Sequence, residues 1–167
     1  MIDFKGDVIK AFLRKANDHI NSGEIELAIN IYLSLLDKYP ECIVAYNNIS
    51  VLFNEILQRE KAIFYIKKGI LASPLYSELY RALGIFLFES GYENKAYKSF
   101  VNAISINRKF DDAYFNLANL FSGYSRSGKV NYIKAINLYK VAIRLNPTNY
   151  KAYLNLADLC THFDETN

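Results

Sequence analysis

The chain has 167 residues, of which 51% are hydrophobic and 22% charged, and this composition favours one folded domain over a disordered chain. The net charge of +3, from 20 basic and 17 acidic residues, is too small to indicate a nucleic-acid partner. No run reaches the roughly 18 apolar residues that a membrane span needs. The first ten residues, MIDFKGDVIK, carry acidic side chains and do not fit a secretory signal.

The two cysteines, Cys42 and Cys160, form neither a disulfide framework nor a metal-ligand spacing. Their use favours a reducing compartment, so we expect a cytoplasmic protein. The two histidines, His19 and His162, stand alone, and no Ser-His-Asp or Cys-His arrangement can be inferred from the sequence. We therefore expect no enzyme activity, no metal and no cofactor.

Residues of one kind recur along the chain every 34 residues, with one later interval of 39. We call the equivalent positions of successive repeats a column. One column is aromatic: Tyr46, Tyr80, Tyr114 and Tyr153. A second column is small: Ala16, Ser50, Gly84, Ala118 and Ala157. A third column is alanine: Ala28, Ala62, Ala96 and Ala135. Self-similarity at such a period is the signature of a repeat architecture.

Each repeat is expected to form two helices. In the second repeat the apolar face runs from Tyr46 to Leu57 at spacings of three, four and seven residues, and a second face runs from Ala62 to Ile70. Gly23 and Gly91 fall between paired helices, where a positive φ is useful. Pro40 follows a second helix, at a place where a helix must stop. The small residues let two helices approach closely, and the tyrosines fill the space between neighbouring hairpins.

This pattern resembles the tetratricopeptide repeat. The segments AYNNISVLF, LYRALGIFLF, AYFNLANLF and AYLNLADLC match the first half of the motif, and AIFYIKKGILASP, AYKSFVNAISINR and AINLYKVAIRLNP match the second. The resemblance implies an all-α, right-handed superhelical solenoid of antiparallel helix pairs. It covers residues 1–167 as a single domain, with repeats at about 9–42, 43–76, 77–110 and 111–149 and a capping helix at about 150–163.

The five extra residues fall in the stretch SGYSRSGKV, residues 122–130. Gly123, Gly128 and Lys129 have the spacing of a phosphate-binding loop, but Val130 stands where that loop needs Ser or Thr. Such a loop also follows a strand, whereas this stretch follows a helical segment. We therefore interpret it as a lengthened turn inside the fourth repeat, which resembles the Sel1-like variant of the family.

The resemblance places a binding groove on the concave face, lined mainly by the first helix of each repeat. Two columns are expected to face it, and their polar members are Asn17, Asn48, Asn116, Asn119, Asn155 and Asp158. An asparagine offers a donor and an acceptor, so it can hold a peptide bond from the side. Asparagines at this place hold peptides in related domains. The alternative is that these residues are polar only because the face is wet.

Some members of the family grip the C-terminal carboxylate of a peptide with lysine, arginine and asparagine side chains. In the first three repeats Asn17 and Asn48 match that clamp, but Leu13, Glu78 and Ala82 occupy its cationic places. From the third repeat onward Arg81, Asn116 and Lys151 match, and Ile85 and Asn155 do not.

The leading hypothesis is a scaffold that binds an extended peptide or a partner helix, without nucleic acid or a membrane span. The first alternative is an accessory region of a larger enzyme such as a transferase, because the last helix has no partner. The second is self-association through the exposed apolar side of that helix, which would give a homo-oligomer.

Overall fold

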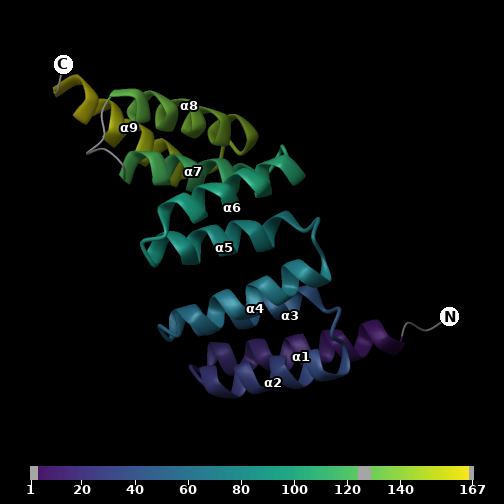
Figure 1. The fold of residues 1–167 in the computed structure, drawn as a ribbon. Helices are drawn as coiled ribbons and strands as arrows, with labels where there is room; N and C mark the ends of the chain where they lie inside the picture. The colour runs from purple at the N-terminus through teal and green to yellow at the C-terminus, as the bar shows by residue number, and fades with distance from the viewer. Residues whose placement is uncertain (1–3, 124–128, 166–167) are drawn as a thin grey trace. The chain divides into compact units, whose positions relative to one another are not determined.

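The structure is a computed structural model that describes residues 4–123 and 129–165 (Figure 1). Within these residues the chain is helical and holds no strand, which confirms the predicted all-α class. The helices are α1 (Phe4–Asn21), α2 (Ile25–Lys38), α3 (Ile43–Glu55), α4 (Arg59–Ala72), α5 (Ser77–Glu89), α6 (Glu93–Ile106), α7 (Asp111–Gly123), α8 (Lys129–Leu145) and α9 (Tyr150–Glu165).

The helices group into two compact units, Met1–Leu75 with α1–α4 and Tyr76–Asn167 with α5–α9. In the first unit each helix packs against the next along the chain, from α1 to α4. In the second unit the same holds from α5 to α9. The single domain expected over residues 1–167 stays a prediction.

The alanine column lies at the centre of the helix pairs. Its four members are all fully buried: Ala28, Ala62, Ala96 and Ala135. The small column is equally buried at Ala16, Ser50 and Ala118. At Gly84 a Cβ atom would come within 2.4 Å of the Phe100 ring, so helices α5 and α6 approach too closely for any side chain there.

The aromatic column only partly follows the expectation. Tyr46, Tyr80 and Tyr114 are half-buried, as side chains between helices should be. Tyr153, in contrast, is 47% exposed, so its expected packing role is wrong in this structure. Tyr153 lies on α9, and this last helix packs against α8 within its unit.

The turns inside the repeats have a left-handed residue at the same place. Gly23 and Gly91 have φ values of 76° and 78°, and Leu57 takes this place in the second repeat with a φ of 61°. The apolar helix face predicted to run to Leu57 therefore stops earlier, because α3 ends at Glu55.

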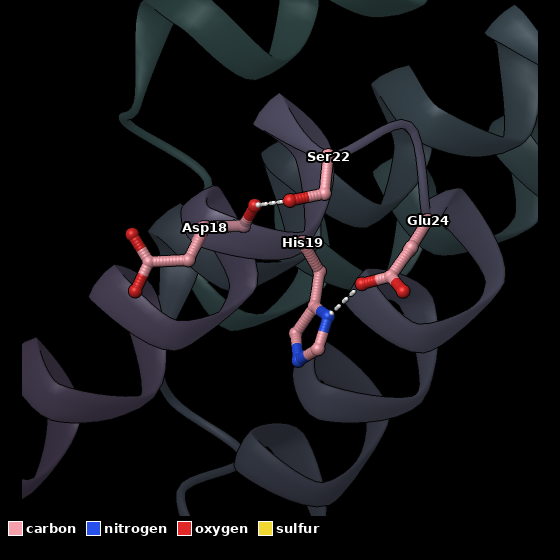
Figure 2. Close-up of polar contacts among 4 residues, drawn as sticks. All are labelled: Asp18, His19, Ser22 and Glu24. Atoms are coloured by element: carbon pink, nitrogen blue, oxygen red, sulfur yellow. Dashed lines mark hydrogen bonds and ion pairs between the residues drawn. The ribbon is translucent and has the colours of Figure 1, made fainter.

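Side chains hold the first of these turns, between α1 and α2 (Figure 2). The Ser22 hydroxyl donates to the Asp18 carbonyl oxygen over 3.1 Å. His19 Nδ1 lies 2.6 Å from Glu24 Oε2, which joins the end of α1 to the residue before α2. His19 thus has a structural contact that ties the end of α1 to the start of α2.

The interval of 39 residues is absorbed mainly at the start of α8. Helix α7 has 13 residues, as α3 and α5 do, whereas α8 has 17 against 14 in α2, α4 and α6. Residues 124–128, with Tyr124 and most of the predicted long turn, lie outside the described residues, so the Sel1-like detail stays a resemblance. A helix, and not a strand, precedes them, so the setting of a phosphate-binding loop is missing.

Candidate functional site

A tyrosine and two asparagines form a hydrogen-bonded cluster in the first unit. Tyr32 on α2 is fully buried, and its hydroxyl lies 3.4 Å from Asn17 Oδ1 on α1. Asn48 Nδ2 on α3 donates to the same hydroxyl over 3.0 Å. We call these residues the first tyrosine cluster. It joins three consecutive helices and uses two of the asparagines predicted to bind a peptide.

The second unit repeats this arrangement. Tyr139 on α8 is 1% exposed, and its hydroxyl donates to Asn119 Oδ1 on α7 over 2.6 Å. Asn155 Nδ2 on α9 reaches Asn119 Oδ1 at 2.9 Å and the Tyr139 hydroxyl at 3.4 Å. These residues form the second tyrosine cluster. The structure thus brings two further predicted site residues, Asn119 and Asn155, together.

The middle repeats lack such a cluster, and their sequence explains why. The column of Tyr32 and Tyr139 continues as Ile66 and Phe100, which have no hydroxyl group to pair. The Asn17 column carries Val51 and Ile85 in these repeats. Polar residues therefore occur together where a tyrosine needs partners, because an unpaired buried hydroxyl would cost free energy.

Burial raises the pKa of both central tyrosines. Loss of solvent is the largest cause for Tyr32, and the hydrogen bond from Asn48 opposes it. Loss of solvent also dominates at Tyr139, where hydrogen bonds with Ser122 and Asn155 oppose it and the Asp158 carboxylate adds a smaller rise. Both hydroxyl groups therefore stay protonated at neutral pH.

A pocket of about 390 Å³ opens beside the second tyrosine cluster. Its lining comes from α7, α8 and α9. The lining residues are Asn119, Ser122, Gly123, Tyr132, Tyr139, Asn155, Asp158 and Leu159. The volume lies within the range of about 300–1,000 Å³ that is common for ligand sites. This pocket is the candidate functional site.

The three residues of the predicted carboxylate clamp lie elsewhere. Asn116 Nδ2 donates to the backbone oxygen of Asp112 over 2.7 Å, within its own helix. The Arg81 guanidinium carbon lies 5.6 Å from the centre of the Phe110 ring, and Arg81 Nε is buried without a hydrogen-bond partner. Lys151 is exposed on α9. No described contact joins these three side chains to one another, and Ala82, expected in the groove, is buried.

Sequence reasoning missed the residues at the centre of both clusters. Tyr32 and Tyr139 share a column with the same intervals as the alanines, and within these four repeats the Asn17 column carries asparagine only in the two repeats with these tyrosines. That joint occurrence was the available signal. Ser122 and Tyr132 gave none, because they flank the insertion, where the repeat pattern assigns no role.

Two further findings concern metal binding and membrane spans. Over residues 4–123 and 129–165, no three histidine, cysteine, aspartate or glutamate side chains gather where they could hold a metal ion. No helix in the described segments has the length and hydropathy needed to cross a membrane.

Comparison with known proteins identifies no matching family model. The chain is 25% identical over 141 residues to mouse protein O-mannosyl-transferase TMTC1, which covers 82% of the chain and 14% of that protein. It is 28% identical over 110 residues to human tetratricopeptide repeat protein 6, which covers 64% of the chain and 20% of that protein. The chain therefore spans a small part of the length of these curated relatives.

Solved structures match more of the chain. The structure of pilF from Pseudomonas aeruginosa matches with a TM-score of 0.83 and 18% identity, over 96% of this chain and 71% of that one. The first tetratricopeptide domain of Spaghetti (RPAP3), bound to an HSP90 peptide, matches with a TM-score of 0.65 and 17% identity. The match covers 73% of this chain and 93% of that one. YrrB, a tetratricopeptide-repeat protein with an unusual peptide-binding site, matches with a TM-score of 0.65 and 16% identity. The match covers 92% of this chain and 76% of that one.

These likenesses agree with the helix pairs, the buried alanine column and the turn residues. The fold of the chain is that of tetratricopeptide-repeat proteins.

Proposed function

We propose that the chain is a protein-interaction scaffold that binds an extended peptide or a partner helix on its first helices, α1, α3, α5, α7 and α9. The observation that carries the proposal is the pocket beside the second tyrosine cluster, which α7 and α9 line with polar side chains. The RPAP3 domain of the same fold is bound to an HSP90 peptide, and this supports a peptide as the ligand.

The test is selection of ligands from a random peptide library by the whole chain, followed by mapping of the best peptide with amide chemical shifts. We expect the shifts to concentrate on the first helices of the repeats. Shifts confined to α2, α4, α6 and α8 would reject the proposal, as would a library that yields no binder.

The asparagines need a modified test, because four of them support the fold. An alanine at Asn48 or Asn155 removes a hydrogen bond to a buried tyrosine, and the loss of a ligand could then reflect loss of structure. Asn116 and Lys151 lie outside both clusters. Their alanine variants are therefore the informative ones for peptide binding.

A carboxylate clamp at Arg81, Asn116 and Lys151 remains a narrower hypothesis. It predicts that Lys151→Ala weakens binding of a peptide with an acidic C-terminus, because a charge-assisted hydrogen bond is lost. Amidation of the peptide C-terminus should weaken binding by at least as large a factor, because it removes the group that all three side chains would bind. Equal affinity in both experiments would remove the clamp.

A second candidate function is an accessory region of a larger transferase. The likeness to a protein named an O-mannosyl-transferase favours it, although the matched part is 14% of that protein. Sequencing of the natural transcript tests this candidate. A reading frame that ends at residue 167 without a catalytic domain would reject it.

Self-association is the third arrangement. Tyr150 and Leu154 on α9 are 65% and 63% exposed, and a second copy could cover them. Light scattering across a concentration series tests this, because a monomer keeps one mass throughout.

A further inference from the structure

Three exposed apolar side chains follow one another along the second repeat at intervals of seven residues. They are Leu57, Phe64 and Leu71, which are 72%, 52% and 81% exposed. Phe64 and Leu71 lie two turns apart on α4 and therefore on the same side of that helix. Leu57 precedes α4, and it lines a surface pocket together with Lys61 from the start of that helix. We call the three apolar residues the α4 ridge.

The other repeats show that the fold does not need an apolar ridge. In these repeats the columns of Phe64 and Leu71 carry polar side chains, and all of them are exposed: Asn30, Lys98 and Asn137 in the first column, and Asp37, Ser105 and Arg144 in the second. Both columns thus face solvent on every second helix. Among the four second helices, only α4 has apolar residues in them.

Leu57 stands at a position that disfavours a leucine. Its column holds Gly23 and Gly91, and all three residues have a positive φ. A left-handed backbone costs a leucine free energy that a glycine does not lose. The exposed side chain has little packing to offset that cost. The second repeat therefore keeps a strained apolar residue at one end of the ridge, and folding alone does not account for it.

Lysines flank the ridge. Helix α4 carries four basic residues and a single acidic one. By helical geometry Lys61 and Lys68 border one side of the ridge and Lys67 borders the other, and none of the three forms an ion pair with a described residue. Lys61 and Lys68 lie over the rings of Phe53 and Phe64, at 5.3 and 4.7 Å, and keep their positive charge there. The surface is thus apolar along its middle and positive at its sides.

We propose that the α4 ridge binds an amphipathic helix of a partner protein, which carries apolar side chains in a heptad pattern and acidic side chains beside them. The ridge is one helix wide and has the spacing at which two helices pack side by side. Acidic residues of the partner would meet the flanking lysines and fix its orientation. The ridge lies on a second helix, so the inference goes beyond the proposed function, which uses the first helices.

Two other occupants fit the ridge less well. A second copy of this chain would bring its own lysines against Lys61, Lys67 and Lys68, and like charges repel. A bilayer surface is flat and favours a wide apolar face, whereas the apolar residues here form a single line on one helix. The same columns of α2, in the same unit, carry Asn30 and the acidic Asp37.

The first experiment selects binders of the whole chain from a library of helical peptides about three heptads long. Leucine is fixed at the a and d positions, and the e and g positions are drawn from glutamate, glutamine and lysine. We expect glutamate to dominate positions e and g, and the best peptide to shift the backbone amides of α4 in the ¹⁵N-labelled chain. A library without binders, enrichment of lysine, or shifts that leave out α4 overturns the proposal.

Substitutions on the ridge take their residues from the other repeats, where the fold accommodates them. Phe64→Asn and Leu71→Ser should each weaken binding of the selected peptide about tenfold, because each removes a central apolar contact. Leu27→Gln, at an exposed leucine of α2, is the control and should leave the affinity unchanged. Circular dichroism confirms the fold of each variant. Parental affinity in both ridge variants, or an equal loss in the control, contradicts the proposal.

Leu57→Gly separates binding from stability. The glycine relieves the backbone strain, so the midpoint of thermal unfolding should rise. The affinity for the selected peptide should nevertheless fall about threefold or more, because one end of the ridge is lost. A residue with a purely structural role would not change the two quantities in opposite directions. An affinity equal to that of the parent chain counts against the proposal.

Charge variants test the flanks of the ridge. Replacing Lys61, Lys67 and Lys68 together with glutamine should weaken binding about tenfold or more and make it less sensitive to salt. Lys98→Gln removes an exposed charge of α6 and is the matched control, with no expected change. A triple variant that binds as tightly as the parent chain would show that the partner does not use the lysines, and the proposal would fail.

The same variants identify the competing occupants. Binding to phosphatidylserine vesicles that the triple lysine variant loses, in the absence of any helical peptide ligand, would assign the ridge to a lipid surface and overturn the proposal. A dimer in light scattering that Phe64→Asn abolishes would assign it to a second copy, with the same consequence. A monomer that ignores the vesicles and binds the acidic helix supports the proposal.

Discussion

The hydroxyl of Tyr139 donates to Asn119 Oδ1 over 2.6 Å and so connects α8 to α7 at the edge of an apolar core. That core is built from Ala118, Ala135, Ala152 and Leu159 around the tyrosine. The low polarity around the pair strengthens the hydrogen bond and makes a missing partner costly. Asparagines that look like ligand-binding residues in the sequence thus contribute to the stability of the fold.

Replacing Tyr139 with phenylalanine should lower the free energy of unfolding by about 1 kcal/mol. The ring stays in place, but Asn119 and Asn155 lose the hydroxyl group that they contact. Urea unfolding measures the change. Tyr153→Phe, at a site that is 47% exposed, is the control and should stay within about 0.5 kcal/mol. Equal effects at the two sites would show that the buried hydroxyl adds no stability.

High pH should destabilise the chain through the buried tyrosines. Burial raises the pKa of Tyr32 and Tyr139 above the usual 10.0, so the unfolded chain releases these protons first. Their contribution is therefore full below about pH 10 and falls as the pH rises further.

The double variant Tyr32→Phe with Tyr139→Phe checks this alkaline loss. We expect its free energy of unfolding to fall less steeply than that of the parent chain above about pH 10, since two of the ionising groups are gone. Urea unfolding at several pH values gives both curves. Parallel curves would contradict the prediction.

Gly84→Ala should destabilise the second unit by about 1–3 kcal/mol. The new Cβ would lie 2.4 Å from the ring of Phe100, which is 1% exposed and has little room to move. The better helix propensity of alanine offsets only part of this cost. Thermal unfolding followed by circular dichroism measures it.

Gly123→Ala is the matched control for Gly84→Ala. Among the residues that the structure describes, its new Cβ would meet only the Phe88 ring, at an ordinary contact distance of 3.6 Å. We expect no loss of stability at this position. A similar loss in both variants would mean that close approach of α5 and α6 is not the cause.

Leu57→Gly should raise the free energy of unfolding by about 1 kcal/mol. Leu57 has a φ of 61°, which costs a branched side chain energy and costs glycine little. Its side chain is 72% exposed, so little packing is lost. Chemical unfolding checks the gain.

The reverse substitution provides the comparison. Gly91 has a φ of 78°, and apart from its chain neighbours no atom of the described residues lies within 4 Å of the place that a Cβ would take. Gly91→Ala should therefore cost about 1 kcal/mol through the backbone alone. A destabilising Leu57→Gly would show that the exposed leucine has contacts which offset its backbone strain.

Much of the fold could be predicted from columns of residues. The alanine column predicted the centre of each helix pair, because only a small side chain fits there, and its four members are fully buried. Gly23 and Gly91 predicted the turns through their backbone freedom. Leu57 was misread as part of a helix, since its apolar side chain fits the helical spacing while its backbone does not.

The candidate site was less predictable. Asn119 and Asn155 were predicted to bind a peptide in the concave groove, but the Tyr139 hydroxyl that both contact lies on another helix, and the spacing within one helix cannot show it. The pocket depends on small side chains at Ser122 and Gly123. A pocket that forms because two side chains are small produces no periodic pattern in the sequence.

The two tyrosine clusters also disfavour some misfolded arrangements of this chain. Hairpins of the same length and architecture can exchange during folding, so that one hairpin occupies the place of another. A hairpin with Tyr32 would keep Asn17 in such an exchange, but in front of α5 it would meet Ala82 in place of Asn48 and lose one hydrogen bond, at a cost of about 1 kcal/mol. Each tyrosine accordingly forms all of its hydrogen bonds only when the next helix carries an asparagine at the position of Asn48 or Asn155.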